Sequence, residues 1–495
     1  MNCEPYGTKW TTRVHKYWVA NQKKDGTFFK RTWFATMYPV VLCLSAGLVV
    51  GQTPVVEWAV NVVNGSGAWG TAVTLDKGGN IYVTGNAGYT ALLGAKFGPD
   101  GKLLWIKPAG GDGVVVGRGI GVDNGGNVYI TGYCNNSTFA MFDSFRIDTT
   151  IGGGFLVKLD NSGNVLWVVQ PTGDGDSPLR LAVDLTGNSY VTGEFFPGTT
   201  DFGGIALTSS GYAGFVAKYD PSGQLLWASQ ADRAGEDIAI DSSGNCYVAG
   251  KGLTKYDSTG NQIWNVSSIP STYGGNGGPS LAVDAQGHSF VPGISVYAPN
   301  PSTSINKYDT HGNLLWSVLT TNIGTGINFD PFGPGRIAVD GMGNTYVTAD
   351  PYLCAKFDGA GRLLWVTNAA RYSSSNFGKD IQYGITTDNA GNCFVTGTFV
   401  GLVRFGSTVL NSGGGEGIYL AKISDPPPSL IISNAGPGVS LSWSISAASF
   451  VLESATSLNP PNWQAASESA GTNGTQLVVT AAINGASRYF RLRKP

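Results

Sequence analysis

Histidine is nearly absent from this chain of 495 residues, which contains only three. His15 lies near the N-terminus, and His288 and His311 each fall in a tight turn between two expected strands. Ser/His/Asp and Cys/His catalytic sets and histidine-ligated metal centres all require an imidazole beside a second reactive group. The sequence therefore contains no recognisable catalytic set, indicates no metal site and implies no cofactor.

Charged residues are also few, at 13% of the chain, and the formal net charge is −2. Residues 1–51 hold seven Lys or Arg but two Asp or Glu. The rest of the chain has 24 basic and 31 acidic residues, which leaves it at about −7. Nucleic-acid binding depends on basic side chains clustered against phosphates, and this acidic body has no such cluster. We therefore expect no nucleic-acid partner.

Cysteine is the third scarce residue, with six in the chain and four after residue 51. No two of them have the Cys-x-x-Cys spacing that zinc sites favour. Cys246 and Cys393 follow Gly-Asn at the same position of two different repeats, so we expect them to lie far apart. We interpret the cysteines as small buried apolar side chains.

No apolar run in the chain is long enough for a comfortable membrane span, which takes about 20 residues. The longest candidate, residues 38–51, follows Lys30 and Arg31, a pattern typical of an export signal. We expect residues 1–51 to be a leader that sends the protein to the periplasm, the cell envelope or the outside. An uncleaved anchor, as its one membrane contact, and a translation start nearer Met37 are alternatives.

Glycine, by contrast, is abundant, at 72 residues, and it falls within a repeated pattern. An apolar run closes on Asp and is followed by a tight turn and Gly-Asn-x-Tyr-Val-Thr-Gly. This pattern is the first half of the repeat, and the second half reads Lys-Tyr-Asp-x-x-Gly-x-Leu-Leu-Trp. The first half recurs at intervals of 43 to 61 residues, a period that suits four short strands per unit. Its seven turns start from Asp76, Asp123, Asp184, Asp241, Asp284, Asp340 and Asp388.

The strand patterns indicate how the units pack. Ile81 and Val83 share one face of a second strand and Tyr82 lies on the other, so both faces are apolar and each sheet should be covered by neighbours. The residue two before each turn Asp is small, which suits a first strand close to a central axis. These residues are Thr74, Gly121, Ala182, Ala239, Ala282, Ala338 and Thr386.

The seventh unit lacks a Leu-Leu-Trp strand after Lys422. Residues 55–60 form a lone strand pattern, and Trp58 matches the Trp that ends each other unit. We predict that this N-terminal strand completes the seventh unit and removes two exposed sheet edges. The sequence thus predicts an all-β chain whose residues 52–424 form a seven-bladed β-propeller.

The segment 198–223, GTTDFGGIALTSSGYAGFVAKYDPSG, closely resembles the SBBP family of β-propeller repeats, found in bacterial secreted proteins. The resemblance extends over residues 55–424. Units 2, 4, 5 and 6 depart from the family pattern between their second and third strands. The resemblance implies a seven-bladed propeller and an exported location, and it implies no particular activity.

A Pro-rich linker at residues 425–428 separates a second predicted domain, residues 429–495. Its short strand patterns predict a small β-sandwich. The domain resembles the C-terminal Ig/fibronectin-like module of exported proteins of planctomycete and verrucomicrobial type. We expect Trp443 and Trp463 to form its core.

Features that recur in every unit are expected to be structural. The Asp-x-x-Gly-Asn turns lack the Asp-x-Asp spacing of a calcium loop. The Lys of each third strand is expected to form a structural pair or a solvated stem, and each fourth-strand Trp to fill space between sheets. Two carboxylate pairs, Asp174 with Asp176 and Glu236 with Asp237, could instead serve acid/base chemistry on sugars or bind a cation.

Three function classes stay open. The first is an exported, monomeric, non-enzymatic scaffold that binds an extracellular glycan or protein ligand. The second is a carbohydrate-active hydrolase or lyase that uses loop carboxylates, and the third is a structural component of the cell envelope or matrix. Binding is favoured over catalysis because no complete catalytic set is present.

The connections between strands vary in length at one end of the units, and variable insertions usually mark the binding face. Connections after a second strand span 133–153, 194–214, 294–304 and 398–417, and connections between units span 107–117, 170–179, 319–335 and 367–381. The ligand-binding residues predicted at this end are Asp112, Asp174, Asp176, Arg180, Arg233, Glu236, Asp237, Tyr273, Asp330, Phe332, Arg336, Arg371, Tyr372 and Asp380.

The export signal can be tested directly. We expect the mature protein to begin near residues 47–53, after the apolar stretch. Intact mass spectrometry of the exported protein measures this. An unprocessed N-terminus recovered with the membrane fraction would favour the anchor instead.

Overall fold

The computed structural model places residues 54–493, apart from a set of short segments. Within the described residues the regular elements are all strands, as the sequence predicts. No helix there is long and apolar enough to cross a membrane. The expected leader and export signal lie outside the described residues. The segments left out of the description are 88–90, 136, 150–152, 173–176, 232–234, 268, 270–279, 296–301, 320–334, 350–352, 372–381, 427, 436–437, 445–449, 474–475 and 483–487.

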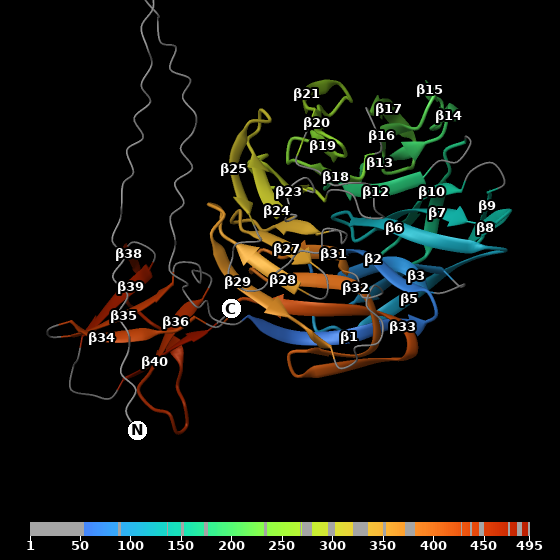
Figure 1. Ribbon diagram of the computed structural model, residues 1–495. Helices are drawn as coiled ribbons and strands as arrows, with labels where there is room; N and C mark the ends of the chain where they lie inside the picture. The colour runs from blue at the N-terminus through green and yellow to red at the C-terminus, as the bar shows by residue number, and fades with distance from the viewer. Residues whose placement is uncertain are drawn as a thin grey trace, which may run out of the picture. The chain divides into compact units, whose positions relative to one another are not determined.

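Seven antiparallel sheets of four or more strands follow one another in the described part of residues 55–424 (Figure 1). We number them 1 to 7 in chain order. Sheet 1 contains β2 (Ala68–Leu75), β3 (Ile81–Ala87), β4 (Ala91–Phe97) and β5 (Leu103–Gly111); sheet 2 contains β6 (Val114–Val122), β7 (Val128–Asn135), β10 (Gly154–Leu159) and β11 (Val165–Val169); sheet 3 contains β12 (Ser177–Val183), β13 (Ser189–Phe195), β16 (Ala213–Tyr219) and β17 (Leu225–Ala231); sheet 4 contains β18 (Asp237–Ile240), β19 (Cys246–Ala249), β20 (Leu253–Tyr256) and β21 (Gln262–Val266). Sheet 5 contains β22 (Ala282–Val283), β23 (Ser289–Ser295), β24 (Ser302–Tyr308) and β25 (Leu314–Leu319); sheet 6 contains β26 (Ile337–Val339), β27 (Thr345–Ala349), β28 (Leu353–Phe357) and β29 (Leu363–Asn368); sheet 7 contains β31 (Gln382–Thr387), β32 (Cys393–Phe405), β33 (Thr408–Ser424) and β1 (Val55–Gly65).

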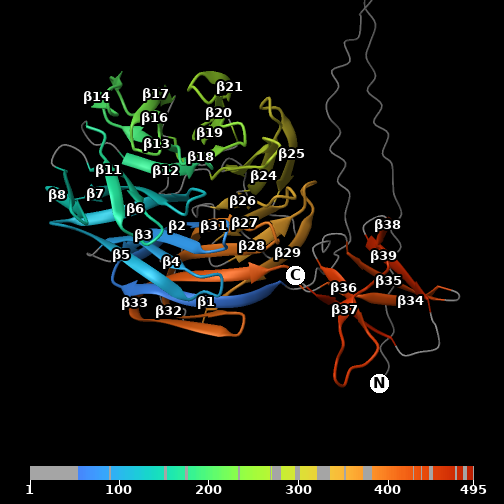
Figure 2. The ribbon, with the colours of Figure 1, turned by 180° about the vertical axis from the view of Figure 1, so that it is seen from behind.

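The N-terminal strand β1 occupies the fourth-strand position of sheet 7, as predicted. Trp58 lies opposite Lys422 of β33. The other sheets use the same pairing, for example Trp227 opposite Lys218 in sheet 3 and Trp365 opposite Lys356 in sheet 6. Figures 1 and 2 show β1, in blue, beside the orange strands β32 and β33. Two segments that lie more than 350 residues apart in the sequence therefore share one sheet.

The first strands of the sheets contact one another in a circle. β2 contacts β6, which contacts β12, and the series continues through β18, β22, β26 and β31 back to β2. Small residues permit this approach, as predicted. A Cβ atom added at Gly121 would lie 2.5 Å from a methyl group of Val183 in the next sheet. The seven first strands thus surround a common axis.

Each fourth-strand Trp joins its sheet to the next. The indole N–H of Trp227 donates to the carbonyl oxygen of Ser258, 3.1 Å away, in the last turn of sheet 4. Gly260 of that turn has a φ of 90° and lies so close over the indole that a Cβ atom would be 2.7 Å from it. Trp therefore fills the space between sheets and also anchors a turn. Equivalent N–H bonds run from Trp105 to Asn161, Trp167 to Pro221, Trp264 to Thr310 and Trp316 to Gly359.

The third-strand lysines are structural, and most are buried rather than solvated. The ammonium group of Lys218 lies 4.7 Å from the ring centre of Tyr190, and Lys218 donates to the Ser258 carbonyl that also accepts from Trp227. Cation–π contacts of this kind gain strength when water is excluded. Lysine, tyrosine and tryptophan of one sheet thus surround one turn of the next.

Sheet 7 has no turn between its third strand, β33, and its fourth strand, β1, because these are more than 350 residues apart along the chain. It therefore needs a substitute for this turn. Asp425, directly after β33, supplies it. Its carboxylate accepts the indole N–H of Trp365 at 2.7 Å and pairs with Lys356 at 2.7 Å. Lys356 is 1% exposed and Asp425 is half-buried, so the lysine of this ion pair is shielded from water.

In the turns between first and second strands, both carboxylate oxygens of the turn Asp accept hydrogen bonds from residues of the same unit. In the turn at Asp340, one oxygen accepts the Asn344 backbone N–H, and the other accepts the Asn344 side-chain amide and the Tyr346 hydroxyl. Gly343 has a φ of 79°, which glycine adopts without strain. The turn therefore holds itself together, in agreement with a structural role.

Three connections that were predicted to be loops are β-hairpins, so that prediction was wrong for them. Residues 133–153 contain β8 (Phe139–Phe142) and β9 (Phe145–Asp148), and residues 194–214 contain β14 (Gly198–Asp201) and β15 (Ala206–Ser209). In residues 398–417, β32 and β33 simply continue to Phe405 and from Thr408. Unit 2 therefore carries a hairpin at the same place as unit 3, although its sequence there departs from the family pattern.

These three rim hairpins lie along the outer edges of the sheets. β8 pairs with β5 of the preceding sheet, and Asp143 at the hairpin tip accepts the Val165 N–H at the start of β11 in its own sheet. A buried Phe precedes a residue with positive φ at each tip. These pairs are Phe142 with Asp143, Phe202 with Gly203 and Phe405 with Gly406. The rim hairpins thus connect neighbouring sheets and extend away from the predicted binding face.

The connection at 107–117 is likewise not a loop. β5 ends at Gly111 and β6 begins at Val114. Asp112 lies in the tight turn between them, and its carboxylate accepts hydrogen bonds from the backbone N–H groups of Thr138 and Phe139 and from two hydroxyls. Asp112 therefore anchors the first rim hairpin.

Residues 431–493 form two further sheets in the part that is described. One contains β34 (Ile431–Ala435), β35 (Gly438–Ser444), β39 (Gln476–Ala482) and β38 (Gly471–Asn473); the other contains β37 (Gln464–Ala465), β36 (Val451–Ala455) and β40 (Tyr489–Arg493). Trp443 is buried with Leu452 of the other sheet, as predicted. Trp463 is only half-buried, and Arg491 lies 4.3 Å above its ring.

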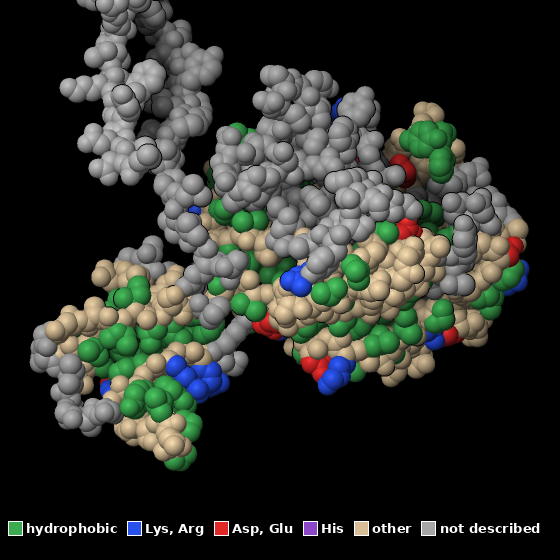
Figure 3. Space-filling view, turned by 60° about the horizontal axis from the view of Figure 1, so that its bottom comes forward, with side chains coloured by type: hydrophobic (Ala, Val, Ile, Leu, Met, Phe, Trp, Pro, Cys, Tyr) green, Lys and Arg blue, Asp and Glu red, His purple; other side chains and the backbone are tan. Residues whose placement is uncertain are grey.

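The surface in Figure 3 carries few charged side chains, in agreement with the composition. The residue before each fourth-strand Trp is aliphatic and about half exposed in most sheets. These residues are Leu104, Leu166, Leu226, Ile263 and Leu315. They belong to different sheets, and scattered apolar side chains of this kind are normal at protein surfaces.

Removal of β1 tests ring closure. Deletion of residues 52–60 should lower the melting temperature and promote association, because it uncovers the edge of β33 and the buried side chains packed on it. Each large apolar side chain that becomes exposed costs about 1.5–3 kcal/mol. Thermal unfolding and size-exclusion chromatography measure both effects. An unchanged, monomeric deletion variant would argue against closure by β1.

The Asp425 ion pair gives a second prediction. Asp425→Ala removes the closer counter-charge of buried Lys356 and leaves only Asp340, 4.0 Å away, which should cost about 3 kcal/mol of folding free energy. Adding Lys356→Met should recover much of that loss, since it removes the stranded charge. Lys102→Ala is the control, because its side chain is 83% exposed and pairs with exposed Asp100. Urea unfolding should separate the three variants, and equal stability of Asp425→Ala and wild type would refute the assignment.

Candidate ligand-binding site

One repeat position builds the described pocket. The residue four before each turn Asp lines a cavity of about 170 Å³, so all seven first strands or their entries contribute to it. The residues at this position, in chain order, are Ala72, Gly119, Arg180, Asp237, Ser280, Arg336 and Gly384. Because the first strands contact each other in a circle, the cavity lies on their common axis.

The lining is asymmetric. Sheets 3 to 6 contribute two arginines, an aspartate and a serine, whereas sheets 7, 1 and 2 contribute Gly384, Ala72 and Gly119. A Cβ atom at Gly119 would lie 2.9 Å from the Leu181 backbone nitrogen, and one at Gly384 would lie 3.1 Å from the Cα of Ala72. One side of the cavity is therefore polar and charged, and the other side carries no charged side chain and includes the backbone of two glycines.

β-bulges set the direction of these side chains. The register shifts between Pro178 and Arg180 in β12, and β2, β6 and β31 shift at the equivalent point. A bulge adds a residue to one strand and re-aims the neighbouring side chain. Thr71, the bulged residue of β2, donates its hydroxyl to the Gly117 carbonyl 2.6 Å away in the next sheet.

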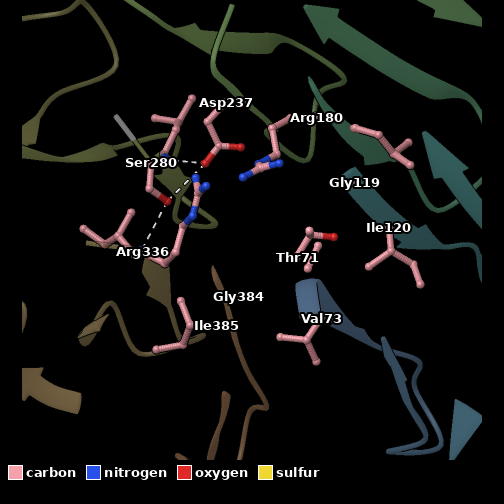
Figure 4. Close-up of a pocket in the computed structure, with 14 residues that line it drawn as sticks. Thr71, Val73, Gly119, Ile120, Arg180, Asp237, Ser280, Arg336, Gly384 and Ile385 are labelled. Carbon is pink, nitrogen blue, oxygen red and sulfur yellow. Dashed lines mark hydrogen bonds between the residues drawn. The ribbon is translucent and has the colours of Figure 1, made fainter. Parts of the chain in front are cut away.

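Two guanidinium groups and a carboxylate converge in the cavity (Figure 4). Arg180 donates to the Arg118 carbonyl oxygen at 2.8 Å, which holds it across the boundary between sheets 2 and 3. Arg336 is 6% exposed and enters from sheet 6. Burial and the positive charge of Arg336 lower the pKa of Arg180 to about 9. Asp237 opposes this shift, and Arg180 remains a cation at neutral pH.

Asp237 has a positioning role in this group. One carboxylate oxygen accepts the Ser280 hydroxyl at 3.1 Å and the Leu281 N–H at 2.8 Å, and the other accepts the Ile238 N–H at 3.0 Å. Ser280 also accepts the Ile337 N–H at 3.2 Å. Asp237 and Ser280 therefore tie sheets 4, 5 and 6 together at the cavity wall, as the dashed lines in Figure 4 show.

Glu236 lies beside this cluster and is half-buried. Burial raises its pKa, and the charges of Arg336 and Arg180 act in the opposite direction. Protonation of Glu236 would leave the cluster more positive. The electrostatics thus favour an anionic group in the cavity over a cation, and no group of His, Cys, Asp and Glu in the described residues could hold a metal ion.

The structure brings together four of the predicted ligand-binding residues: Arg180, Glu236, Asp237 and Arg336. Asp112 is separate and anchors a rim hairpin. Arg371 is placed by its backbone in β30 (Ala370–Arg371), which pairs with β32. The remaining predicted residues lie outside the described residues: Asp174, Asp176, Arg233, Tyr273, Asp330, Phe332, Tyr372 and Asp380.

Sequence reasoning missed Ser280 and the glycines of the cavity. The sequence did contain a signal for them, which was their common position within the repeat. At four residues before the turn Asp, the residue type changes from unit to unit, while the surrounding repeat stays the same. A variable position inside a constant frame is typical of a ligand-facing site in a repeat protein.

Exposed aromatic side chains occur at the same end of the sheets. Phe196 follows β13 and Tyr212 precedes β16, and their ring centres are 4.9 Å apart. Tyr212 is 69% exposed, and Trp69, at the start of β2, is 46% exposed. Aromatic rings of this kind offer flat apolar faces for stacking.

Comparisons with known proteins agree on a repeat architecture. A family model described as a beta-propeller repeat, SBBP, matches residues 89–140, which span the third strand of sheet 1 to the first rim hairpin. The chain is 27% identical over 191 residues to the "Uncharacterized WD repeat-containing protein L264" of Acanthamoeba polyphaga mimivirus. That alignment covers 36% of this chain, and the chain spans only 13% of the relative.

Among solved structures, a protein of unknown function from Bacteroides caccae is similar at 13% identity and a TM-score of 0.39. The match covers 62% of this chain and 97% of that one. The sequence matches support a repeat protein of the β-propeller type.

Proposed function

We propose that the protein is an exported, monomeric binding protein, built as a seven-bladed β-propeller with a small Ig/fibronectin-like sandwich after it. The blades are sheets 1 to 7, and β1 closes the ring. The circle of first-strand contacts and the pairing of β1 with β33 support this architecture. The leader pattern in residues 1–51 supports export to the cell envelope or beyond.

The proposed ligand carries an acidic group that enters the axial cavity. The observation that carries this proposal is the convergence of Arg180 and Arg336 on one side of a cavity whose other side carries no charged side chain. Guanidinium groups bind carboxylates, sulfates and phosphates through paired N–H donors. Asp237 and Ser280 hold the wall in place, so a ligand meets a site that is already formed.

Size and surroundings point to an acidic sugar of a glycan. A cavity of about 150 Å³ accommodates one benzene ring, so the volume here suits one six-membered ring. A uronic acid combines such a ring with a carboxylate. The exposed rings of Phe196, Tyr212 and Trp69 offer further sugar units a place to stack.

The carbohydrate-active alternative has less support. Hydrolysis by two carboxylates needs one as acid and one as base or nucleophile, both facing the scissile bond. Asp237 already accepts three hydrogen bonds from the protein, which leaves Glu236 as the remaining carboxyl of that pair. A purely structural envelope role would give the ring no use for an arginine-lined cavity.

Calorimetric titration with a uronic-acid oligosaccharide tests the proposal. Arg180→Gln should weaken binding about 10-fold or more, because one charge-assisted pair contributes about 1.4 kcal/mol or more. A neutral oligosaccharide of the same length should bind much more weakly to the wild type. Increasing salt should reduce the preference for the acidic ligand.

Lys102→Gln is the matched control, since it removes one cation from an exposed turn at the other end of sheet 1. It should leave uronate binding unchanged. Equal affinity of wild type and Arg180→Gln, with both folded by circular dichroism, would contradict the axial site. Equal binding of acidic and neutral sugars would contradict an acidic ligand.

A further inference from the structure

Two buried cysteines meet at the boundary between sheets 6 and 7. The Sγ atoms of Cys354 on β28 and Cys393 on β32 are 3.6 Å apart. Cys354 is 1% exposed and Cys393 is fully buried, and both belong to one core cluster with Tyr346 and Trp365. The two residues come from different sheets, so their contact depends on the packing of one sheet against the next.

The boundary between sheets 3 and 4 has other residues at the equivalent positions. Cys354 stands two residues before the third-strand Lys, and Cys393 directly follows Gly-Asn. In sheets 3 and 4, the equivalent positions hold Val216 and Cys246, which share one core cluster. Among the described cysteines, only Cys354 and Cys393 face each other across this contact.

We propose that Cys354 and Cys393 form a disulfide that links sheet 6 to sheet 7 under oxidising conditions. Sulfur atoms in a disulfide are about 2.05 Å apart, so the pair must approach by a small side-chain rotation. Sheet 7 is the one sheet assembled from both ends of the ring, and this bond would fix it covalently to its neighbour.

The oxidant is a low-molecular-weight disulfide such as oxidised glutathione. A thiolate of one cysteine attacks a sulfur of the oxidant and releases one reduced thiol, which leaves a mixed disulfide. The second cysteine then attacks the protein sulfur, forms the Cys354–Cys393 bond and releases a second reduced thiol. Two protein protons end on the two released thiols.

The bond should form while the sheets assemble rather than afterwards. Burial raises the pKa of the Cys393 thiol well above its usual range, and the neighbouring Cys354 adds to this shift. A thiol that seldom ionises reacts slowly with disulfides. The partly folded chain, in which both thiols meet solvent, is therefore the reactive state.

Refolding in a glutathione redox buffer tests the proposal. The chain is denatured, reduced, refolded with excess oxidised glutathione, unfolded again and alkylated without reduction. Peptide mapping should find a Cys354–Cys393 linked peptide. Cys246 is the internal control, because it is equally buried but faces Val216, and it should be alkylated. Alkylation of both Cys354 and Cys393 in refolded protein would overturn the proposal.

Stability gives an independent readout. Reduction should lower the melting temperature of the oxidised wild type by about 3 °C or more. Cys354→Val copies the contact of sheet 3 and should show no response to reductant; Cys393→Ser, which copies Ser189 of sheet 3, is the second variant. A response to reductant in both variants would refute the link. Conversely, Val216→Cys should create a second linked peptide, with Cys246. None of these readouts depends on ligand binding.

Discussion

The structure depends on one contact that is repeated between neighbouring sheets. A tryptophan of one sheet donates its indole N–H to a turn of the next, while a glycine in that turn lies flat on the ring. A buried lysine over a tyrosine ring completes the contact. Because the apolar faces are covered only by neighbouring sheets, no sheet is stable by itself. Where the chain ends prevent the turn from forming, Asp425 supplies the acceptor and the counter-charge instead.

The candidate site follows from this regularity. The repeated contact brings the first strands together in a circle of contacts, and one position of each described unit lines a shared cavity. The residue type at that position differs from unit to unit: Asp237 and Ser280 hold the wall together, whereas Gly119 and Gly384 allow a close approach of neighbouring strands. Arg180 and Arg336 can then be placed opposite Gly119 and Gly384 without disturbing the frame. The two arginines on one side and the uncharged lining on the other support the proposal that the cavity binds an anion.

The rim hairpins show why insertions need not mark a binding face. Each one begins at the end of the sheets where the cavity lies, but a buried Phe at its tip draws it along the outer edge. There it pairs with or contacts the outer strand of the preceding sheet. This covers edges that would otherwise offer unpaired backbone groups to another chain. The insertions in units 2, 3 and 7 therefore stabilise the ring, and the axial cavity does not depend on them.

Sequence alone predicted the four strands of each unit, the tight turns, the repeat and the place of residues 55–60 in the seventh unit, because alternating side chains, Asp-x-x-Gly turns and a missing strand are local signals. It also identified Arg180, Glu236, Asp237 and Arg336 as candidates from their place near the first strands. It could not determine which of the many loop charges share a cavity, that Asp112 anchors a hairpin, or that Cys354 meets Cys393. Those facts depend on distances between units, which the packing of the sheets decides. Repeat spacing gives the position of a residue along the chain, whereas a site is formed by residues that are close together in space.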